Sequence, residues 1–362
     1  MPTAANLQEF RVVRLNAVVN PIPALETELC QRYGIRTMPV DVETPEELIP
    51  HVADCDALFV VAAQLPRAVI DSLKHCRLIS RLGNGTDKID VERAKERGII
   101  VSNVPFFCLE EMADHSMGMV VALSRRVPQM SRHMYAGTFL AARIEAQKLQ
   151  RLNTQTLGLV GFGSTAKAVA KRAKAFGMRV MATRRKRQAP NPDAEALGVE
   201  MADLDTVLRE ADFVVLLLPL NAETYHLIDE AALRKMKPTA NLINIARGAI
   251  TDEQALAAAL REGRLAGAAI DTFKEIEIFT GVEAPPVHPL MELDNVILTP
   301  HVSGLSVQSM NEVSITGVEN MATVLSGHWP HPDNIVNQSV VPWMPLAAYD
   351  PNLIARLALG PA

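Results

Sequence analysis

Residues Thr156–Gly177 read TLGLVGFGSTAKAVAKRAKAFG, and this stretch decides the fold. A short apolar run meets the pattern Gly161-x-Gly163-x-x-Ala166, after which apolar and basic residues alternate with helical spacing. In such a strand–turn–helix unit the first glycine permits a tight turn, and the second lets the backbone approach a pyrophosphate. The helix N-terminus offers unpaired N–H groups to that anion. The pattern therefore predicts a dinucleotide-binding turn, the alternative being an ordinary glycine-rich loop.

Short apolar runs alternate with helix-like stretches on both sides of this unit. Runs such as ALFVVAA (57–63), FVVLLLP (213–219) and NLINIA (241–246) have the length of buried strands. Alternation of this kind predicts parallel sheets covered by helices on both faces. A more polar segment is expected after the long helical stretch Leu109–Arg126.

Bulk composition limits the class of protein. A chain of 362 residues suggests two domains, and 48% hydrophobic with 21% charged residues is ordinary for a globular protein. A net charge of −5 and 4% aromatic residues give no reason to expect a nucleic-acid partner. The apolar runs are too short to span a bilayer, and four scattered cysteines without metal-ligand spacing indicate reduced thiols in a cytoplasmic protein.

The second strand of the nucleotide unit ends in basic residues. In an NAD-binding unit an acidic residue about twenty positions after the turn holds the ribose 2′-hydroxyl. Here the strand RVMATR ends at Arg184, which is followed by Arg185, and guanidinium groups are suited to a 2′-phosphate. The sequence thus favours NADP over NAD, unless these arginines belong to a solvated basic loop.

Two further side chains follow apolar runs in the same half of the chain. Arg247 comes directly after NLINIA, and His301 follows NVILTP. An arginine at the carboxyl edge of a parallel sheet can grip a carboxylate with two hydrogen bonds, and a histidine is suited to proton transfer near neutral pH. Position alone is equally compatible with a surface arginine and a structural histidine.

Several linked motifs resemble the D-isomer-specific 2-hydroxyacid dehydrogenase family, especially its glyoxylate/hydroxypyruvate reductases. The resemblance covers roughly residues 57 to 322, and its motifs stand in the family's order: RLGNGTDKIDVERAKERGIIVSN, NVPFFCLEEMADHSMGMVVALSR, GFGSTAKAVAKRAKAFGM, PLNAETYHLIDEAALRKMKPTANLINIARG, ALREGRLAGAAIDTF and HPLMELDNVILTPHVSG. The second motif departs from the family in having Asp114 where a glutamate is usual.

The resemblance implies two doubly wound α/β domains, with a Rossmann cofactor domain (108–304) inserted into a flavodoxin-like substrate domain (1–107 and 305–340) and followed by a tail (341–362). It implies hydride transfer between a nicotinamide cofactor and a small 2-keto or D-2-hydroxy acid, with Arg247 and His301 as catalytic residues and no metal. The implied substrate contacts are Val61, Gly83, Asn84, Gly85 and Arg247. The implied cofactor contacts are Gly161, Gly163, Ser164, Thr165, Arg184, Arg185, Pro219, Thr224, Ala246, Asp271, Ser116 and Gly304.

The chain leaves the family's spacing at the glutamate that should pair with His301. The expected position, twenty-nine residues after Arg247, is occupied by Ile276. A one-residue bulge would bring Glu277 into place, which is the preferred assignment. Glu275, Glu283 or no carboxylate at all remain alternatives.

The resemblance also bears on substrate and assembly. Val61 stands where phosphoglycerate dehydrogenases of the family carry an arginine, which disfavours a phosphorylated substrate. Glyoxylate, hydroxypyruvate or another small 2-keto acid is expected, reduced with NADPH by a homodimer. The alternatives are a cofactor-sensing binding protein of the same fold without significant turnover, and a dehydrogenase with a non-standard substrate.

Overall fold

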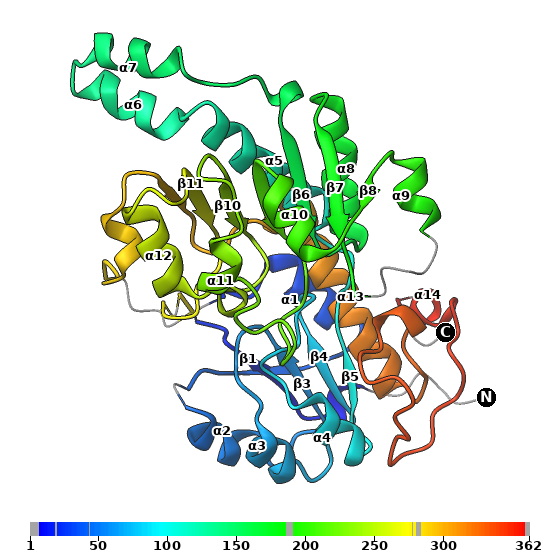
Figure 1. Ribbon diagram of the computed structural model, residues 1–362. Helices are drawn as coiled ribbons and strands as arrows, with labels where there is room; N and C mark the ends of the chain where they lie inside the picture. The colour runs from blue at the N-terminus through cyan, green and yellow to red at the C-terminus, as the bar shows by residue number, and fades with distance from the viewer. Residues whose placement is uncertain are drawn as a thin grey trace. The chain divides into compact units, whose positions relative to one another are not determined.

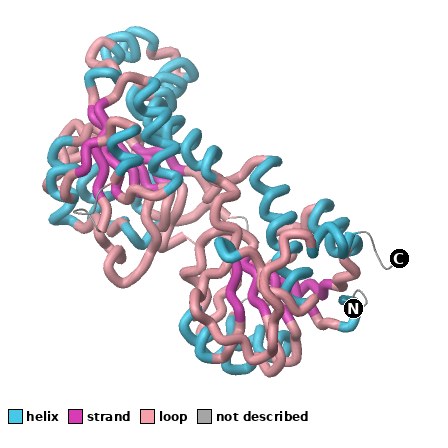
Figure 2. Tube along the Cα trace, turned by 90° about the vertical axis from the view of Figure 1, so that its right-hand side faces the viewer, coloured by secondary structure: helices cyan, strands magenta, loops and turns pink. Residues whose placement is uncertain are grey.

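A computed structural model describes residues 7–18, 20–42, 44–185, 191–276, 278–279 and 284–358. The chain divides into two compact units. The first is formed by the described parts of Met1–Phe107, Phe279–Val282 and Ser306–Ala362, and the second by those of Cys108–Ile278 and Glu283–Leu305. Figure 2 shows strands at the centre of each unit and helices around them.

The first unit is built on a five-stranded parallel sheet with the order β2-β1-β3-β4-β5. Figure 1 labels four of these strands, β1, β3, β4 and β5. This is the flavodoxin-like strand order. Alternate residues of the strands enter two separate apolar cores, one on each face. The strands are β1 (Val12–Leu15), β2 (Thr37–Val40), β3 (Ala57–Val60), β4 (Leu78–Arg81) and β5 (Ile100–Ser102).

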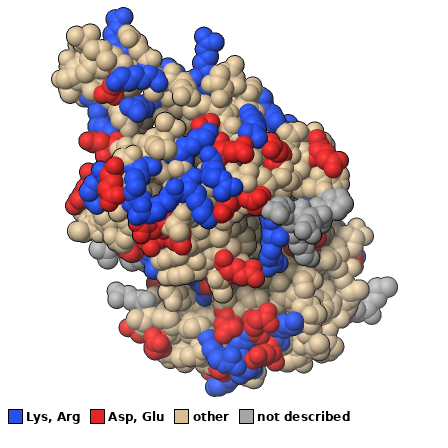
Figure 3. Space-filling view, viewed as in Figure 1, with Lys and Arg blue, Asp and Glu red and all other residues tan. Residues whose placement is uncertain are grey.

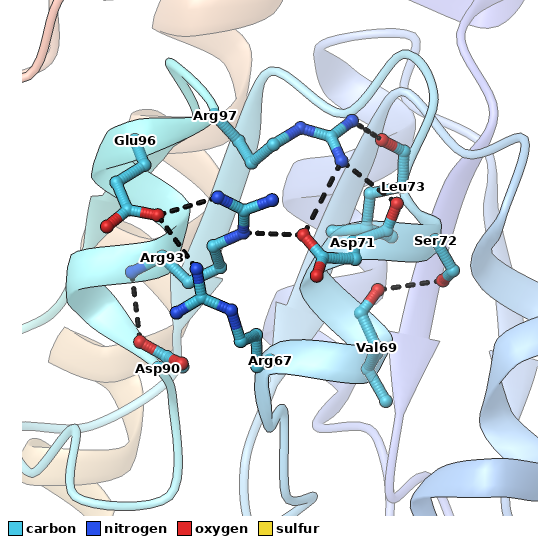
Figure 4. Close-up of polar contacts among 9 residues, drawn as sticks. All are labelled: Arg67, Val69, Asp71, Ser72, Leu73, Asp90, Arg93, Glu96 and Arg97. Carbon is cyan, nitrogen blue, oxygen red and sulfur yellow. Dashed lines mark hydrogen bonds and ion pairs between the residues drawn. The ribbon is translucent and has the colours of Figure 1, made fainter.

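Helices from both ends of the chain cover this sheet. One core is shared with α1 (Ala24–Arg32) and α13 (Val307–Leu325), and the other with α2 (Pro45–Val52), α3 (Arg67–Ser72) and α4 (Val91–Glu96). Exposed ion pairs join α3 to α4, among them Arg93 Nε to Asp71 Oδ1 at 2.5 Å (Figure 4). Such exposed pairs are worth only about 0–1 kcal/mol each, so the apolar cores carry the stability of the unit.

The C-terminal tail packs on the first unit and ends in α14 (Leu353–Ala358). The Trp343 indole donates to the Cys76 carbonyl at 2.8 Å, and the Arg77 guanidinium lies 5.7 Å from the Trp343 ring centroid. The Ala347 N–H donates to the Gly327 carbonyl at 2.8 Å. The tail therefore belongs to the packed structure of this unit.

The second unit is built on a seven-stranded parallel sheet with the order β12-β11-β10-β9-β6-β7-β8. Together the two parallel sheets confirm the predicted fold class. The strands are β6 (Thr156–Val160), β7 (Arg179–Thr183), β8 (Glu200–Met201), β9 (Phe213–Leu216), β10 (Asn241–Asn244), β11 (Gly267–Ile270) and β12 (Val296–Leu298).

Helices cover both faces of the second sheet. One core includes α5 (Leu109–Ser124), α8 (Ser164–Ala175) and α9 (Pro192–Ala196), and the other α10 (Leu204–Glu210), α11 (Glu230–Leu233) and α12 (Glu253–Arg261). Asp252 caps α12 by accepting the Ala255 N–H at 3.0 Å, as its sequence predicts. Short 3₁₀ turns are η1 (Leu7–Glu9), η2 (Leu152–Thr154), η3 (Gly248–Ile250), η4 (Pro289–Glu292) and η5 (Pro332–Asn334).

The segment after α5, where the sequence predicts a more polar stretch, is helical. It forms two helices, α6 (Val127–Tyr135) and α7 (Phe139–Ala146), and neither helix has a buried residue. Exposed side chains of this pair include Val127, Met134, Tyr135, Phe139, Leu140 and Ile144. The two helices themselves were not predicted, because none of their residues packs into the core.

Candidate active site

The glycine turn after β6 has the geometry of a phosphate cradle. Gly161 has φ +101°, and a Cβ added there would lie 2.4 Å from the Leu217 carbonyl oxygen, so a side chain is excluded. Gly163 caps the N-terminus of α8, and a Cβ added there would meet no atom within 4 Å. Ser164 and Thr165 form the first turn of this twelve-residue helix. The turn thus fits a dinucleotide pyrophosphate, because backbone N–H groups are approachable at a helix N-terminus.

The two arginines of the predicted 2′-phosphate site lie at the end of β7. The Gly161 N–H donates to the Thr183 carbonyl at 3.0 Å, so this strand end is beside the glycine turn. Arg184 is half-buried and Arg185 is exposed. Arg185 Nη1 lies 3.2 Å from Glu223 Oε2. The strand end therefore presents guanidinium groups where an NAD-binding unit carries an acid.

The loop after β9 contains two more of the predicted cofactor contacts. The Thr224 hydroxyl donates to the Pro219 carbonyl and accepts the Asn221 N–H, both at 2.8 Å. These bonds close the loop on itself at the carboxyl end of the strand. Ala246 is buried after the next strand, β10, where its N–H donates to Asn244 Oδ1 at 3.1 Å.

Arg247 is held in place by a buried asparagine that sequence reasoning missed. Asn244 is 1% exposed, and its amide donates to the Arg247 carbonyl at 2.9 Å and to the Thr251 hydroxyl at 3.3 Å. Arg247 itself has extended backbone, is half-buried, and donates from Nη1 to the Ala246 carbonyl at 2.7 Å. Side-chain bonds from Asn244 to both sides of the turn fix the backbone that carries the guanidinium.

Strand register brings Arg247, Asp271 and His301 to one edge of the second sheet. Asn244 pairs with Ile270, and Ile270 pairs with Leu298. The three functional candidates follow these paired positions by three, one and three residues. The carboxyl edge of a parallel sheet is where α/β proteins bind ligands, and the glycine turn after β6 lies on the same edge.

Asp271 organises the segment that carries His301. Its carboxylate is fully buried and accepts the Thr299 hydroxyl at 2.6 Å, the Val302 N–H at 2.9 Å and the Ser303 N–H at 3.0 Å. The Asp271 carbonyl accepts the His301 N–H at 2.8 Å. His301 has φ +55°, a left-handed conformation that costs a non-glycine residue about 1–3 kcal/mol. The bonds to Asp271 hold the histidine in this conformation.

Ser116 and Gly304 occupy the α5 side of the second unit. Ser116 is fully buried in α5, where its hydroxyl donates to the Met112 carbonyl at 2.7 Å. Gly304 lies against Cys108, since an added Cβ would be 3.2 Å from the Cys108 Cβ. The Ser116 hydroxyl is therefore already bonded within its own helix.

The glutamates that compete for His301 are only partly covered by the described residues. Glu277, the preferred partner, and Glu283 lie outside them. Glu275 is described: its Oε2 accepts the Gln254 amide at 2.8 Å and lies 3.7 Å from His288 Nε2. The Glu275 carboxylate is thus engaged with α12 and His288.

The predicted substrate loop lies in the first unit, after β4. Gly83 has φ +140°, and its carbonyl accepts the Val104 N–H at 3.0 Å. Asn84 accepts the Asn103 amide through its carbonyl at 2.8 Å, and Arg81 Nε donates to the Gly85 carbonyl at 2.9 Å. Bonds from neighbouring strands therefore give the Gly83–Gly85 loop a defined backbone.

Val61 follows the neighbouring strand β3 and is half-buried against the core shared with α13. It offers no charge at this strand end. Arg81, which pairs with Val60 in the sheet, carries a guanidinium at the end of the neighbouring strand β4, and sequence reasoning did not single it out. Its bond to the Gly85 carbonyl makes it a support of the loop backbone.

Comparison with known proteins agrees with this fold. The family description "D-isomer specific 2-hydroxyacid dehydrogenase, NAD binding domain" matches residues 117–303. A glyoxylate reductase of Korarchaeum cryptofilum is 38% identical over 296 residues, covering 81% of this chain and 86% of that protein. A D-3-phosphoglycerate dehydrogenase of Methanocaldococcus jannaschii is 35% identical over 319 residues, covering 88% of this chain and 58% of that protein.

A solved structure is also similar over nearly the whole chain. The NADPH-dependent glyoxylate/hydroxypyruvate reductase of Sinorhizobium meliloti, in complex with NADP and malonate, superimposes with a TM-score of 0.77 and 27% identity. The superposition covers 93% of this chain and 100% of the solved chain. The chain belongs to the D-isomer-specific 2-hydroxyacid dehydrogenase family. It is an NAD(P)-dependent oxidoreductase that acts on small 2-keto or 2-hydroxy acids.

Among the helices in the described part of the chain, none is both long and apolar enough to cross a bilayer.

Proposed function

We propose that the protein is an NADPH-dependent reductase of a small 2-keto acid such as glyoxylate or hydroxypyruvate. The observation that carries the proposal is the convergence of Arg247, Asp271 and His301 on the sheet edge that also bears the Gly161–Gly163 cradle. The naming of relatives as glyoxylate reductases supports the substrate class. Val61 adds support, because it offers no charge for a phosphorylated substrate.

The site residues divide the work of the reaction. Bound NADPH supplies the hydride that reduces the carbonyl carbon. Arg247 grips the substrate carboxylate with two parallel hydrogen bonds and polarises the carbonyl. His301 donates a proton to the carbonyl oxygen during reduction and accepts it back during oxidation.

Substitution of the two catalytic residues tests this division. His301→Ala is expected to lower kcat for glyoxylate by about 10²–10⁴-fold while NADPH still binds, because only the proton donor is lost. Arg247→Lys also lowers turnover, since one ammonium cannot reproduce the bidentate fork. His75→Ala, at an exposed histidine of the first unit, is the matched control. Near-normal turnover in both site variants would refute the assignment.

The cofactor preference rests on Arg184 and Arg185. Replacing both with serine is expected to lower kcat/KM for NADPH by about 10–100-fold, the value of charge-assisted hydrogen bonds to a phosphate, and to leave NADH nearly unchanged. Arg234→Ser, at the exposed arginine that follows α11, is the control. A wild-type preference for NADH would contradict the NADP assignment.

We propose Glu277 as the carboxylate partner of His301. The bond of Glu275 to Gln254 supports this choice, because it engages one competing carboxylate elsewhere. For Glu277→Gln, reduction should fail at lower pH than in wild type, since a histidine without its carboxylate neighbour loses its proton more easily. Glu275→Gln and Glu283→Gln are the comparisons. If Glu283→Gln alone shifts the profile, Glu283 is the partner instead.

We further propose a cytoplasmic homodimer joined through α6 and α7. The six exposed apolar side chains of this helix pair support the interface, since a monomer rarely leaves such a group in water. Figure 3 shows largely uncharged side chains over this region, broken by a few lysines and arginines. Leu140→Glu combined with Phe139→Glu should convert dimer to monomer in light scattering. Val341→Glu, at an 81% exposed site of the tail, is the control.

A further inference from the structure

A buried ionic cluster lies outside the residues assigned above. Glu253 begins α12 and His288 precedes η4, and each of these residues is only 4% exposed. They are 35 residues apart in the sequence, yet His288 Nε2 lies 3.1 Å from Glu253 Oε2. Ionisable side chains are rarely buried this deeply unless they are paired or bind a metal.

The Glu253 carboxylate accepts bonds from the chain that leads to the competing glutamates. Its Oε1 accepts the Lys274 N–H at 2.7 Å, and its Oε2 accepts the Glu275 N–H at 3.4 Å. The next residue of α12, Gln254, donates to the Glu275 carboxylate at 2.8 Å. The start of α12 therefore binds the backbone and a side chain of the segment Phe273–Glu275.

The same segment is pressed against the residue that follows Arg247. A Cβ added to Gly248 would lie 2.2 Å from the Phe273 carbonyl carbon and 2.3 Å from the Lys274 nitrogen. Only glycine permits this approach of two backbones. The Phe273 ring also meets the His288 ring edge-on, with centroids 6.1 Å apart. Segment 273–275 is thus held between Gly248 on one side and the Glu253–His288 pair on the other.

The donor geometry favours a hydrogen-bonded pair over a metal site. Glu253, Glu275 and His288 offer ligand atoms within 4.8 Å of one another. However, His288 Nδ1 accepts the Leu290 N–H at 3.3 Å, which places the ring proton on Nε2, toward Glu253. A metal ion bound at Nε2 would need the lone pair of that nitrogen, so the ring proton would have to move to Nδ1. There it would face the Leu290 N–H, which is also a donor.

We propose that Glu253 and His288 are positioning residues for the reductase. Together they hold Phe273–Glu275 against Gly248, and thereby set both the backbone beside Arg247 and the starting point of the stretch that carries Glu277. The catalytic consequence rests on the proposed function. The structural consequence, immobilisation of segment 273–275 by the buried pair, does not.

Hydrogen exchange tests the structural part without any substrate. In Glu253→Gln, an NH₂ group replaces one of the two carboxylate oxygens. This group then faces either the His288 Nε2–H or a backbone N–H, so that buried donor loses its acceptor. The amides of Lys274 and Glu275 should exchange at least about tenfold faster than in wild type. His288→Gln should show a smaller increase. Glu262→Gln, at the exposed C-terminal end of the same helix, is the control. Unchanged protection in both site variants would overturn the proposal.

Kinetics tests the catalytic part at a temperature where all variants are folded. We expect kcat for glyoxylate to fall about tenfold in Glu253→Gln with the Kd of NADPH nearly unchanged, because geometry rather than cofactor binding is disturbed. In the pH profile of kcat for reduction, the high-pH limb should also move to lower pH. Mere loss of stability would not produce this shift. A lowered Tm with normal kcat and a normal pH profile would overturn the positioning role.

Two outcomes separate this inference from its alternatives. Loss of wild-type activity in EDTA, restored by zinc, would overturn the hydrogen-bonded pair in favour of a metal centre. If wild-type protein reduces no 2-keto acid, the proposed function fails. Faster exchange in Glu253→Gln would still support the immobilised segment, so the two failures are distinguishable.

Discussion

Replacement of Asp271 by asparagine removes the acceptor around which the His301 segment is built. The carboxylate accepts three bonds, from Thr299, Val302 and Ser303. The least costly placement of an asparagine keeps its oxygen at the position that accepts two bonds and points its NH₂ group at the Ser303 N–H. That buried donor is then left without an acceptor, at a cost of about 1–3 kcal/mol.

This cost can be converted into two measurable quantities. A unit of this size loses about 2–4 °C in Tm for each kcal/mol of stability lost. A cost of about 1–3 kcal/mol therefore lowers the Tm by about 2–12 °C. The left-handed backbone of His301 stores about 1–3 kcal/mol of strain, which the weakened segment no longer opposes fully. A shift of the imidazole by about 1 Å lowers kcat by about 10²-fold.

The assay is glyoxylate reduction at saturating NADPH, with the Kd of NADPH and the Tm measured on the same samples. If Asp271 positions His301, kcat falls while the Kd changes within about threefold. Asp205→Asn, at an exposed residue paired with Lys235, is the control. A variant with normal kcat and Tm would refute the reasoning. A large rise in Kd with normal kcat would assign Asp271 to the cofactor alone.

Three further predictions concern packing around the site and in the first unit. Gly248→Ala should lower the Tm, because overpacking costs about 1–3 kcal/mol, and it should lower kcat because the displaced backbone adjoins Arg247. Trp343→Phe should destabilise the first unit by about 1 kcal/mol in urea unfolding, since the indole bond to the Cys76 carbonyl is lost. Burial raises the pKa of Cys30 to about 12 and raises that of Cys76 as well, so both should resist thiol reagents at pH 8 until the protein unfolds.

Local pattern was enough to predict the elements that form the framework of the site. The glycine turn at Gly161, the strand ends before Arg247 and His301, and the cap at Asp252 all follow from residues close together in sequence. Hydrophobic period and capping are local properties, so they can be read without knowledge of the packing. The fold class followed from the alternation of these elements, and the family from their order.

Other features could not be predicted because they depend on residues distant in sequence. The exposed helices α6 and α7 carry no stripe of buried residues to mark them, since their apolar side chains do not face the core of the chain. The C-terminal tail has no strong pattern of its own, and its place follows from the contact of Trp343 with the start of β4.

The sequence alone determined the parallel α/β architecture, the nucleotide turn and the candidate residues Arg247 and His301. Only the tertiary structure decided how these residues are held. Strand register set Asp271 beside the His301 segment, and packing brought His288 to Glu253 across 35 residues. The physical reason is that secondary structure depends on near neighbours, whereas the acceptors of buried side chains are fixed only when distant segments pack together.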